Sequence, residues 1–186
     1  MLSWNANHSR KHGHKLFACD NGCFSQPDKY SDEGFLDWLD DLDRSGCLFA
    51  TAPDVLADGD ATLARATPML PAIRNLGFRA AYVGQDGQRA DRVPWDDLDA
   101  LFIGGTTEWK LSGIAADLIH EAKRRGKWVH MGRVNSWTRI YPASVLGVDS
   151  VDGTHLTFRP DRYTPKVIDW LDRIEKEPSL FGSEDG

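Results

Sequence analysis

The feature that most constrains the fold is a repeated alternation of short apolar runs with longer segments of helical periodicity. Each run has the length and composition of a buried strand. The segments between the runs place apolar residues three and four positions apart, as amphipathic helices do. Strands that alternate with helices are typical of βα units, which build a parallel sheet covered by helices. The sequence predicts strands at residues 16–19, 47–51, 79–83, 100–103, 128–131 and 150–151.

Three of the intervening segments predict helices. Apolar stripes within residues 35–42 and 114–122 indicate two of them. A third helix is predicted to end at Gly77, with Asp60 or Thr62 as its N-cap, because acidic and hydroxyl side chains favour helix starts and glycine favours helix ends.

The number of βα units sets the fold class. Six units fall short of the eight in a TIM-type (β/α) barrel, so a complete barrel needs further strands within residues 1–7 and 156–159. We therefore predict an α/β fold, namely a TIM-type barrel that is truncated or irregular if those strands are missing. The chain of 186 residues fits a single domain over residues 1–186. Residues 1–15 form a polar basic N-terminal arm, either a tail or a phosphate-contacting segment.

Composition excludes several classes of protein and partner. The net charge of -6 argues against broad, nonspecific coating of nucleic acid, although a local basic surface could still hold one strand. The three cysteines, Cys19, Cys23 and Cys47, have no spacing typical of a disulfide framework or zinc site, and no motif implies a metal or organic cofactor. No apolar segment approaches the ~20 residues that span a bilayer, so we expect a cytoplasmic protein with no membrane partner. The oligomeric state is open.

Polar residues and glycines follow the carboxyl ends of the predicted strands. In a βα barrel these ends converge on one mouth, where catalytic side chains lie. We therefore expect residues from distant parts of the sequence to share one pocket. They are Asp20, Asn21, Asp54, Gln85, Asp86, Gly104, Gly105, Gly132, Arg133 and Asp152.

Four segments around these positions carry a family resemblance. They are Cys-Asp-Asn-Gly-Cys-Phe at residues 19–24, Phe-Ile-Gly-Gly at 102–105, His-Met-Gly-Arg-Val at 130–134 and Gly-Val-Asp-Ser-Val-Asp at 147–152. In this order they resemble the Asp-Ser-Gly-Gly-Phe, Gly-Gly, Met-Gly-x-Gly and Gly-x-Asp-x-x-Asp segments of the tRNA-guanine transglycosylase (queuine tRNA-ribosyltransferase) superfamily. The short branch that modifies DNA with deazapurines is the most similar. The resemblance covers about residues 16–155.

The resemblance implies a pentosyltransferase that replaces guanine by a 7-deazaguanine-type base. Asp152 would be the nucleophile that forms a covalent aspartyl-sugar intermediate, and Asp20 would be the general acid/base that takes a proton from the incoming base. The chemistry of base exchange also requires such a pair, because an oxocarbenium-like transition state needs a carboxylate beneath C1′ and a proton carrier near the base.

The resemblance also implies a base-binding site. Asp54 would accept hydrogen bonds from N1 and the exocyclic amine of the purine, and Gln85 would donate to its 6-oxo group. Gly104 and Gly105 would let backbone amides approach the base edge. Met131 would lie against the ring face as a polarizable platform.

Further substrate contacts are assigned to the remaining positions. Arg133 would hold a phosphate near the scissile nucleotide. Asn21, Phe24 and Gly132 complete the predicted substrate-binding set. Since Asn21 and Cys23 replace the Ser and the second Gly of the commonest family pattern, the base contacts near Asp20 differ from that pattern.

Each of these residues also has a purely structural interpretation. Asp20 and Asp152 precede turn-forming residues, so either can belong to a turn. Asp54 can cap a helix, Gln85 can be a solvated loop residue, and Gly104 and Gly105 can mark a tight turn. Arg133 can be a surface ion-pair partner. His130, on a buried strand, is interpreted as a core histidine without a catalytic role.

Three functions remain open on the sequence. The chain lacks the cysteine and histidine zinc segment of the tRNA enzymes, so DNA is favoured over tRNA or a nucleoside as the substrate of base exchange. An N-glycoside hydrolase could use the same barrel with water in place of the incoming base. The third alternative is a noncatalytic subunit that binds deazapurine or nucleic acid.

Overall fold

The computed structural model describes residues 2–3 and 16–176 of the chain. Within them, parallel strands form one sheet whose order follows the sequence. The strands are β1 (Leu2–Ser3), β2 (Phe17–Asp20), β3 (Cys47–Thr51), β4 (Ala80–Gly84), β5 (Ala100–Ile103), β6 (Trp128–Met131) and β7 (Ser150–Val151). The six strands predicted from apolar runs are thereby confirmed, two of them with a shift of one residue. Of the N-terminal arm predicted for residues 1–15, all but β1 lies outside the described residues.

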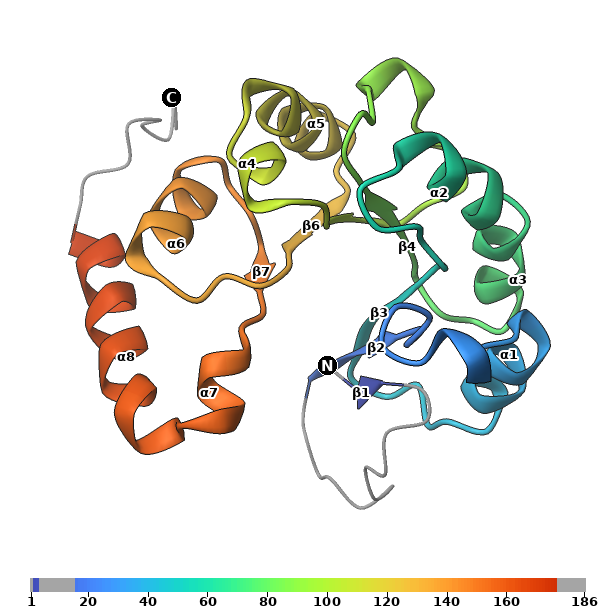
Figure 1. The fold of residues 1–186 in the computed structure, drawn as a ribbon, viewed down its shortest axis with the longest axis horizontal. Helices are drawn as coiled ribbons and strands as arrows, with labels where there is room; N and C mark the ends of the chain where they lie inside the picture. The colour runs from blue at the N-terminus through green and yellow to red at the C-terminus, as the bar shows by residue number, and fades with distance from the viewer. Residues whose placement is uncertain (1, 4–15, 177–186) are drawn as a thin grey trace, which may run out of the picture.

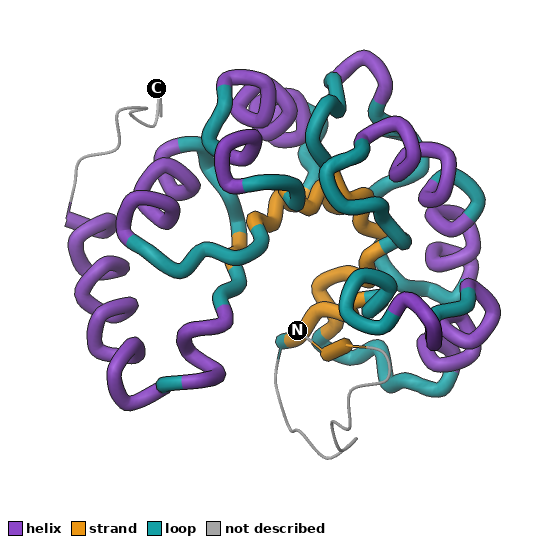
Figure 2. Tube along the Cα trace, viewed as in Figure 1, coloured by secondary structure: helices purple, strands orange, loops and turns teal. Residues whose placement is uncertain are grey.

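From β2 onwards, helices connect successive strands and cover one side of the sheet. They are α1 (Asp32–Asp40), α2 (Gly59–Ala66), α3 (Met69–Asn75), α4 (Thr107–Lys110), α5 (Gly113–Arg124), α6 (Trp137–Val145), α7 (Thr154–Phe158) and α8 (Pro160–Lys176), with short 3-10 turns η1 (Pro27–Lys29) and η2 (Ala90–Arg92). The strands lie along the inside of an arc and the helices form its outer layer (Figures 1 and 2). This arrangement is an α/β fold of the open-barrel kind.

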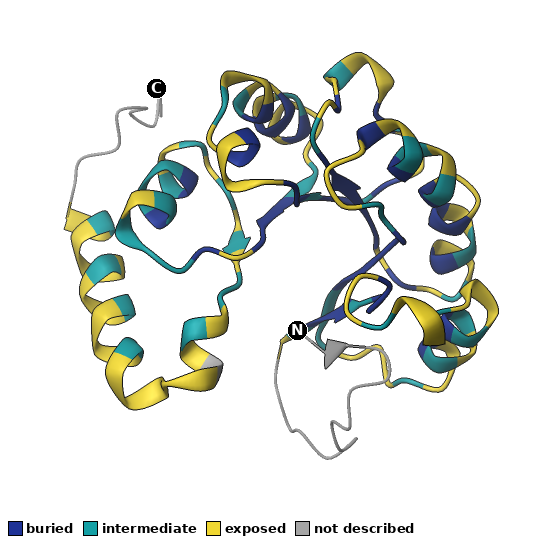
Figure 3. Ribbon diagram, viewed as in Figure 1, coloured by how far each residue is buried: buried dark blue, intermediate teal, exposed yellow. Residues whose placement is uncertain are grey.

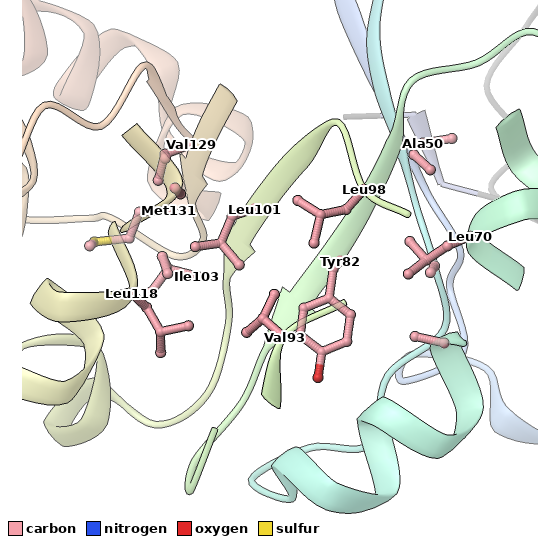
Figure 4. Packing of buried hydrophobic residues seen from close by; sticks show 14 of the residues in the cluster. Ala50, Leu70, Tyr82, Val93, Leu98, Leu101, Ile103, Leu118, Val129 and Met131 are labelled. Carbon is pink, nitrogen blue, oxygen red and sulfur yellow. The ribbon is translucent and has the colours of Figure 1, made fainter. Parts of the chain in front are cut away.

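Because successive side chains of a strand point to opposite faces of the sheet, the apolar residues of the strands fall into two cores. The larger core lies between the sheet and the helices, where Leu101, Ile103 and Met131 meet Leu118 of α5 (Figure 4). The smaller core lies on the inner face of the arc. It consists of Ala18, Phe49, Ala81 and Ala100, with Leu48, Phe102 and Trp128 packed against it. Figure 3 shows strands β2 to β6 as largely buried, whereas β7 is not.

The sheet does not close into a barrel within the described residues. In this part of the chain β1 pairs only with β2, and β7 pairs only with β6. The expected strand within residues 1–7 is present as β1. The expected strand at residues 156–159 is wrong, because this segment belongs to α7 and its C-cap. Asn135 Oδ1 accepts the His155 amide proton at 3.1 Å in the first turn of α7, which favours the helix.

The predicted helix boundaries are confirmed in part. The apolar stripes form α1 and α5, although Ile114 is 51% exposed. The third predicted helix is divided at Pro68 into α2 and α3, and Gly77 follows α3 with a φ of 81°. The N-cap prediction is wrong. Asp58, rather than Asp60 or Thr62, caps α2 by accepting a hydrogen bond from the Ala61 amide at 2.9 Å. The side chain at the N-cap can reach the free amides of the first turn, whereas Asp60 already lies within that turn.

Helices α7 and α8 extend the arc beyond β7. Helix α8 packs against α6 and α7, and none of its residues is buried. In the described part of the chain, no helix combines the length and the apolar character needed to cross a membrane.

Candidate active site at the carboxyl ends of the strands

A cavity of about 220 Å³ lies where the carboxyl ends of β2 to β7 meet. Nine of the twelve residues predicted for the site line it, and Asp86, Gly105 and Met131 do not. The lining residues are Asp20, Asn21, Gly22, Phe24, Ser25, Thr51, Asp54, Leu56, Val83, Gln85, Phe102, Gly104, Gly132, Arg133 and Asp152. The structure therefore brings together side chains more than a hundred positions apart in the sequence. Their roles stay predictions.

Asp152 is held by hydrogen bonds at both its backbone and its side chain. Its amide donates to the Met131 carbonyl at 3.2 Å and its carbonyl accepts from the Val134 amide at 2.6 Å, which extends the pairing of β6 with β7. Oδ1 accepts from the Arg133 amide at 2.8 Å, and Oδ2 lies 3.1 Å from His130 Nε2. Burial pushes the pKa of Asp152 upward, but these two side-chain hydrogen bonds outweigh it, so the pKa is lowered overall. Asp152 is an anchored, ionised carboxylate.

Asp20 faces the same cavity with much weaker support. Within the described part of the chain, its side chain accepts a hydrogen bond from the Gly22 amide, at 3.3 Å to Oδ1. Burial raises the pKa of Asp20; the Gly22 hydrogen bond opposes this rise, and the negative charges of Asp54 and Asp152 add to it. Asp20 therefore holds a proton more readily than an ordinary aspartate, whereas Asp152 holds one less readily. The turn interpretation accounts for the Gly22 contact but not for the shared cavity.

Asp54 and Gln85 form a hydrogen-bonded pair on the cavity wall. Gln85 Nε2 donates to Asp54 Oδ2 at 2.6 Å, and Gln85 Oε1 accepts from the Ala57 amide at 3.0 Å. The solvated-loop interpretation of Gln85 is wrong, since the residue is 2% exposed. The helix-cap interpretation of Asp54 is also wrong, because Asp58 occupies that position. The pair presents carboxylate oxygens and an amide N–H, which can form hydrogen bonds to the edge of a bound ligand.

Asn21 mainly builds the loop that carries Asp20. Its Nδ2 donates to the Ala52 carbonyl at 3.0 Å, and its Oδ1 accepts from the Cys23 amide at 2.8 Å. These bonds join the ends of β2 and β3 and occupy both ends of the side-chain amide. By contrast, Phe24 is 66% exposed and Leu56 is 44% exposed, so the cavity has apolar side chains at its rim.

Two glycines give the cavity its shape because a side chain has no room there. A Cβ atom at Gly104 would lie 2.8 Å from Val83 Cγ1 and 2.9 Å from Gln85 Nε2. A Cβ atom at Gly132 would lie 2.7 Å from Phe102 Cε1 and 3.6 Å from Asp152 Oδ2. Any side chain at either position would displace the residues that surround the cavity.

Gly105 lies outside the cavity wall but is joined by a hydrogen bond to Arg133, which lines the cavity. Gly105 has a φ of 69°, and its carbonyl accepts from Arg133 Nη2 at 2.8 Å. The tight-turn interpretation therefore fits Gly105. Arg133 itself has a φ of 58°, a conformation that costs a non-glycine residue of the order of 1 kcal/mol. This conformation points the Arg133 amide at Asp152 Oδ1.

The predicted role of Met131 at the ring face is wrong. Its side chain is 1% exposed and lies in the core between the sheet and the helices. Because side chains alternate along a strand, Met131 points away from the inner face, where His130 and Gly132 lie. The Met-Gly pattern identified the strand end, but it did not show on which face each side chain lies.

Sequence reasoning missed His130. The side chain is 4% exposed, as the core interpretation expects, yet its Nε2 contacts the Asp152 carboxylate at 3.1 Å. A signal was available, because His130 is two residues before Gly132 and therefore shares its face of β6. Ser25, Thr51, Leu56, Val83 and Phe102 were also missed as lining residues.

Comparisons with known proteins support the fold alone. No family model matches the chain, and no curated protein matches it. Solved structures of tryptophan synthase from Pyrococcus furiosus are similar in fold. A structure of the complex has a TM-score of 0.52 at 16% identity, and one of a mutant alpha-subunit has 0.51 at 19%. Both comparisons cover 90% of this chain and 66% of the other.

Tryptophan synthase from M. tuberculosis gives a TM-score of 0.52 at 15% identity, covering 86% of this chain and 59% of that chain. These alpha-subunit neighbours are TIM barrels, of whose length this chain spans at most about two thirds. The likeness therefore agrees with a truncated (β/α) barrel.

Proposed function

We propose that the chain is a base-exchange transglycosylase, a pentosyltransferase that replaces guanine by a 7-deazaguanine-type base on DNA. One observation carries the proposal. Asp20 and Asp152 come from strands far apart in the sheet, line one cavity, and have environments that move their pKa values in opposite directions. Two carboxyl groups with separated pKa values are what acid/base and nucleophilic roles at one carbon require.

The reaction then proceeds by two displacements at C1′. In the first, a carboxylate oxygen of Asp152 forms a bond to C1′ while the bond from C1′ to the guanine nitrogen breaks. The electron pair stays on that nitrogen, and Asp20, whose raised pKa favours the protonated form, supplies the proton. In the second, Asp20 takes a proton from the incoming base, whose nitrogen attacks C1′ and releases Asp152 as a carboxylate. Both groups return to their starting states.

The cavity wall fits the edge of a guanine-type base. Asp54 oxygens can accept from N1 and the exocyclic amine, while the second N–H of Gln85 Nε2 can donate to the 6-oxo group. At about 220 Å³ the cavity is smaller than the ~300–1,000 Å³ of sites for drug-sized ligands, a size suited to a single base. Exposed Phe24 at the rim offers an aromatic face for stacking.

The proposed substrate is a DNA strand, on the strength of the resemblance to the short deazapurine branch. The exposed Arg133 would approach the phosphate next to the scissile nucleotide. The overall negative charge restricts such contacts to the neighbourhood of the cavity rather than the whole surface.

The test is release and exchange of labelled guanine from DNA, with tRNA and guanosine as parallel substrates. We expect exchange on DNA that D152N and D20N each abolish, while D60N, a change at an exposed position outside the cavity, retains it. Circular dichroism of each variant checks the fold. Retained exchange in both cavity variants would contradict the proposal. Free sugar ends without a new base would assign the chain to the hydrolases instead.

A further inference from the structure

A chain of hydrogen bonds runs behind Asp152, on the inner face of β6 and β7. Trp128 Nε1 donates to Ser150 Oγ at 2.9 Å. Ser150 Oγ lies 2.8 Å from His130 Nδ1, and His130 Nε2 lies 3.1 Å from Asp152 Oδ2. The strand register pairs His130 with Ser150, so the side chains at alternate positions of both strands meet on one face.

The donors in this chain fix the form of the His130 ring. An indole N–H can only donate, so Ser150 Oγ accepts from Trp128 and has its own proton to give. His130 Nδ1 is the acceptor that the described residues place beside this hydroxyl. The ionised Asp152 carboxylate can only accept, so Nε2 carries the proton that it donates to Asp152, and in the neutral ring Nδ1 then accepts from the Ser150 hydroxyl.

The ring is also fixed by packing. Its centroid lies 5.3 Å from that of Phe49 and 4.7 Å from that of Phe102. His130 does not line the cavity, although the Asp152 carboxylate that it contacts does. A ring in this place can orient the carboxylate but cannot touch a ligand in the cavity.

We propose that His130 is a positioning residue that holds the Asp152 carboxylate as an Nε2–H donor, with the Ser150 hydroxyl holding the other ring nitrogen. The inference rests on the proposed role of Asp152 as the nucleophile. His130 holds Oδ2 and the Arg133 amide holds Oδ1, so the plane of the carboxylate is set from both sides. The remaining lone pairs are then directed to the cavity before substrate binds, which lowers the reorganisation needed for attack.

Removal of His130 has a directional effect on ionisation. Burial raises the pKa of Asp152, and the His130 hydrogen bond is the largest opposing influence, so His130→Leu is expected to raise this pKa. The acid limb of the pH profile for kcat/KM then moves to higher pH. The other charged or titratable groups facing Asp152 stay in place. They are Asp20 on β2, Lys110 on α4, Arg133 after β6 and His155 on α7.

The kinetic test compares wild type, H130L and H130Q in the full chain. Gln can place an N–H donor near the position of Nε2, whereas Leu cannot. H130L is expected to lower kcat by about 10- to 100-fold, as the removal of an orienting partner typically does, with little change in KM. H130Q is expected to restore most of kcat and the position of the acid limb. Equal losses in both variants, with an unmoved acid limb, would overturn the proposal.

The structural test is independent of activity. Nitrogen-15 NMR of the histidine ring distinguishes the two neutral tautomers, and we expect the Nε2–H form in wild type and in S150A, because the Asp152 carboxylate still accepts from Nε2 in that variant. A wild-type ring protonated on Nδ1 would overturn the proposal. If wild type shows no base exchange on any substrate, the proposed function fails, and the NMR result alone decides whether His130 is the Nε2–H donor to Asp152.

Discussion

Asp20 and Asp152 share a cavity but differ in the donors that surround them. Asp152 accepts hydrogen bonds from the Arg133 amide and His130 at 2.8 and 3.1 Å, whereas Asp20 accepts from the Gly22 amide at 3.3 Å. Asp20 also faces two other carboxylates. Its ionised form is therefore poorly stabilised in the folded protein, and this cost to stability is the counterpart of its proposed role as a proton carrier.

The first prediction concerns the stability of D20N. A group with a raised pKa stabilises the fold at low pH, and this contribution is lost as the pH rises through the folded-state value. At neutral pH D20N, which carries no charge, is therefore expected to unfold at a higher temperature than wild type. The difference is expected to shrink as the pH falls below the raised pKa of Asp20. Thermal unfolding followed by circular dichroism at several pH values measures this.

The matched variant D86N is expected to behave in the opposite way. Burial raises the pKa of Asp86, but hydrogen bonds from the Thr106 hydroxyl at 2.6 Å and amide at 2.8 Å lower it overall. This stabilising contribution is present at neutral pH and is lost as the pH falls. D86N is expected to lose about 1 kcal/mol at neutral pH. A destabilised D20N or a stabilised D86N would contradict the electrostatic account.

The second prediction uses two glycines. G132A places a Cβ atom 2.7 Å from Phe102 Cε1, so Phe102 or the end of β6 must move. Overpacking of this kind costs about 1–3 kcal/mol, and a shift of Asp152 by ~1 Å can cost ~100-fold in rate. Assays of base exchange and of unfolding are expected to show a loss of rate larger than the loss of stability explains.

Gly113 in α5 is the control, since a Cβ atom there meets nothing within 4 Å. G113A is expected to retain full exchange and to keep or gain stability, by at most about 1 kcal/mol. A fully active G132A would show that the close packing of Phe102 against Gly132 does not position Asp152.

For single residues, the sequence predicted which positions lie together at the cavity, but it did not predict the face of the sheet to which every side chain points. The strand-end rule located Asp20, Asp54, Gln85 and Asp152 because it needs only the strand boundaries. Met131 was misplaced because side chains on both faces of β6 are buried, so the sequence does not show which face points to the cavity. The structure identifies the inner face of the sheet through the smaller core around Phe49.

At the element scale, the third prediction separates the observed helix cap from the predicted one. Asp58 accepts a hydrogen bond from the Ala61 amide at 2.9 Å, whereas Asp60 is 72% exposed in an ion pair with Arg92 at 2.6 Å. D58A is expected to lower the free energy of unfolding by about 1 kcal/mol, the usual value of an N-cap. D60A is expected to lower it by less, because exposed ion pairs contribute little. Urea unfolding measures both, and the reverse order would contradict the assignment.

Strands and helices differed in how well the sequence predicted them. Buried apolar runs predicted five of the six expected strands, β2 to β6, since burial on both faces leaves few alternatives for such runs, whereas the short β7 is not buried. The strand predicted at residues 156–159 is absent because the prediction came only from the eight-strand count of a complete barrel. Residues 154–158 form α7 instead, and this helix is held by contacts with other parts of the chain, namely Asn135 at its start and the stacking of His155 on Tyr163 at 4.2 Å. No local pattern reveals either contact.

At the scale of the whole molecule, the site depends on the sequential order of the parallel sheet. Each strand carries its carboxyl end to the same edge, so Asp20 at the end of β2 and Asp152 after β7 reach one cavity although the sheet stays open. Figure 1 shows β2 and β7 on opposite arms of the arc. The central claim is that the two carboxylates act at one sugar carbon between these arms.

The most direct test is mass spectrometry of the protein after acid quenching with guanine-containing DNA. The account predicts a covalent sugar adduct on the peptide that carries Asp152, absent in D152N and depleted when excess incoming base is added before the quench. Base exchange by wild type with no adduct on that peptide, or an adduct that persists in D152N, would contradict it.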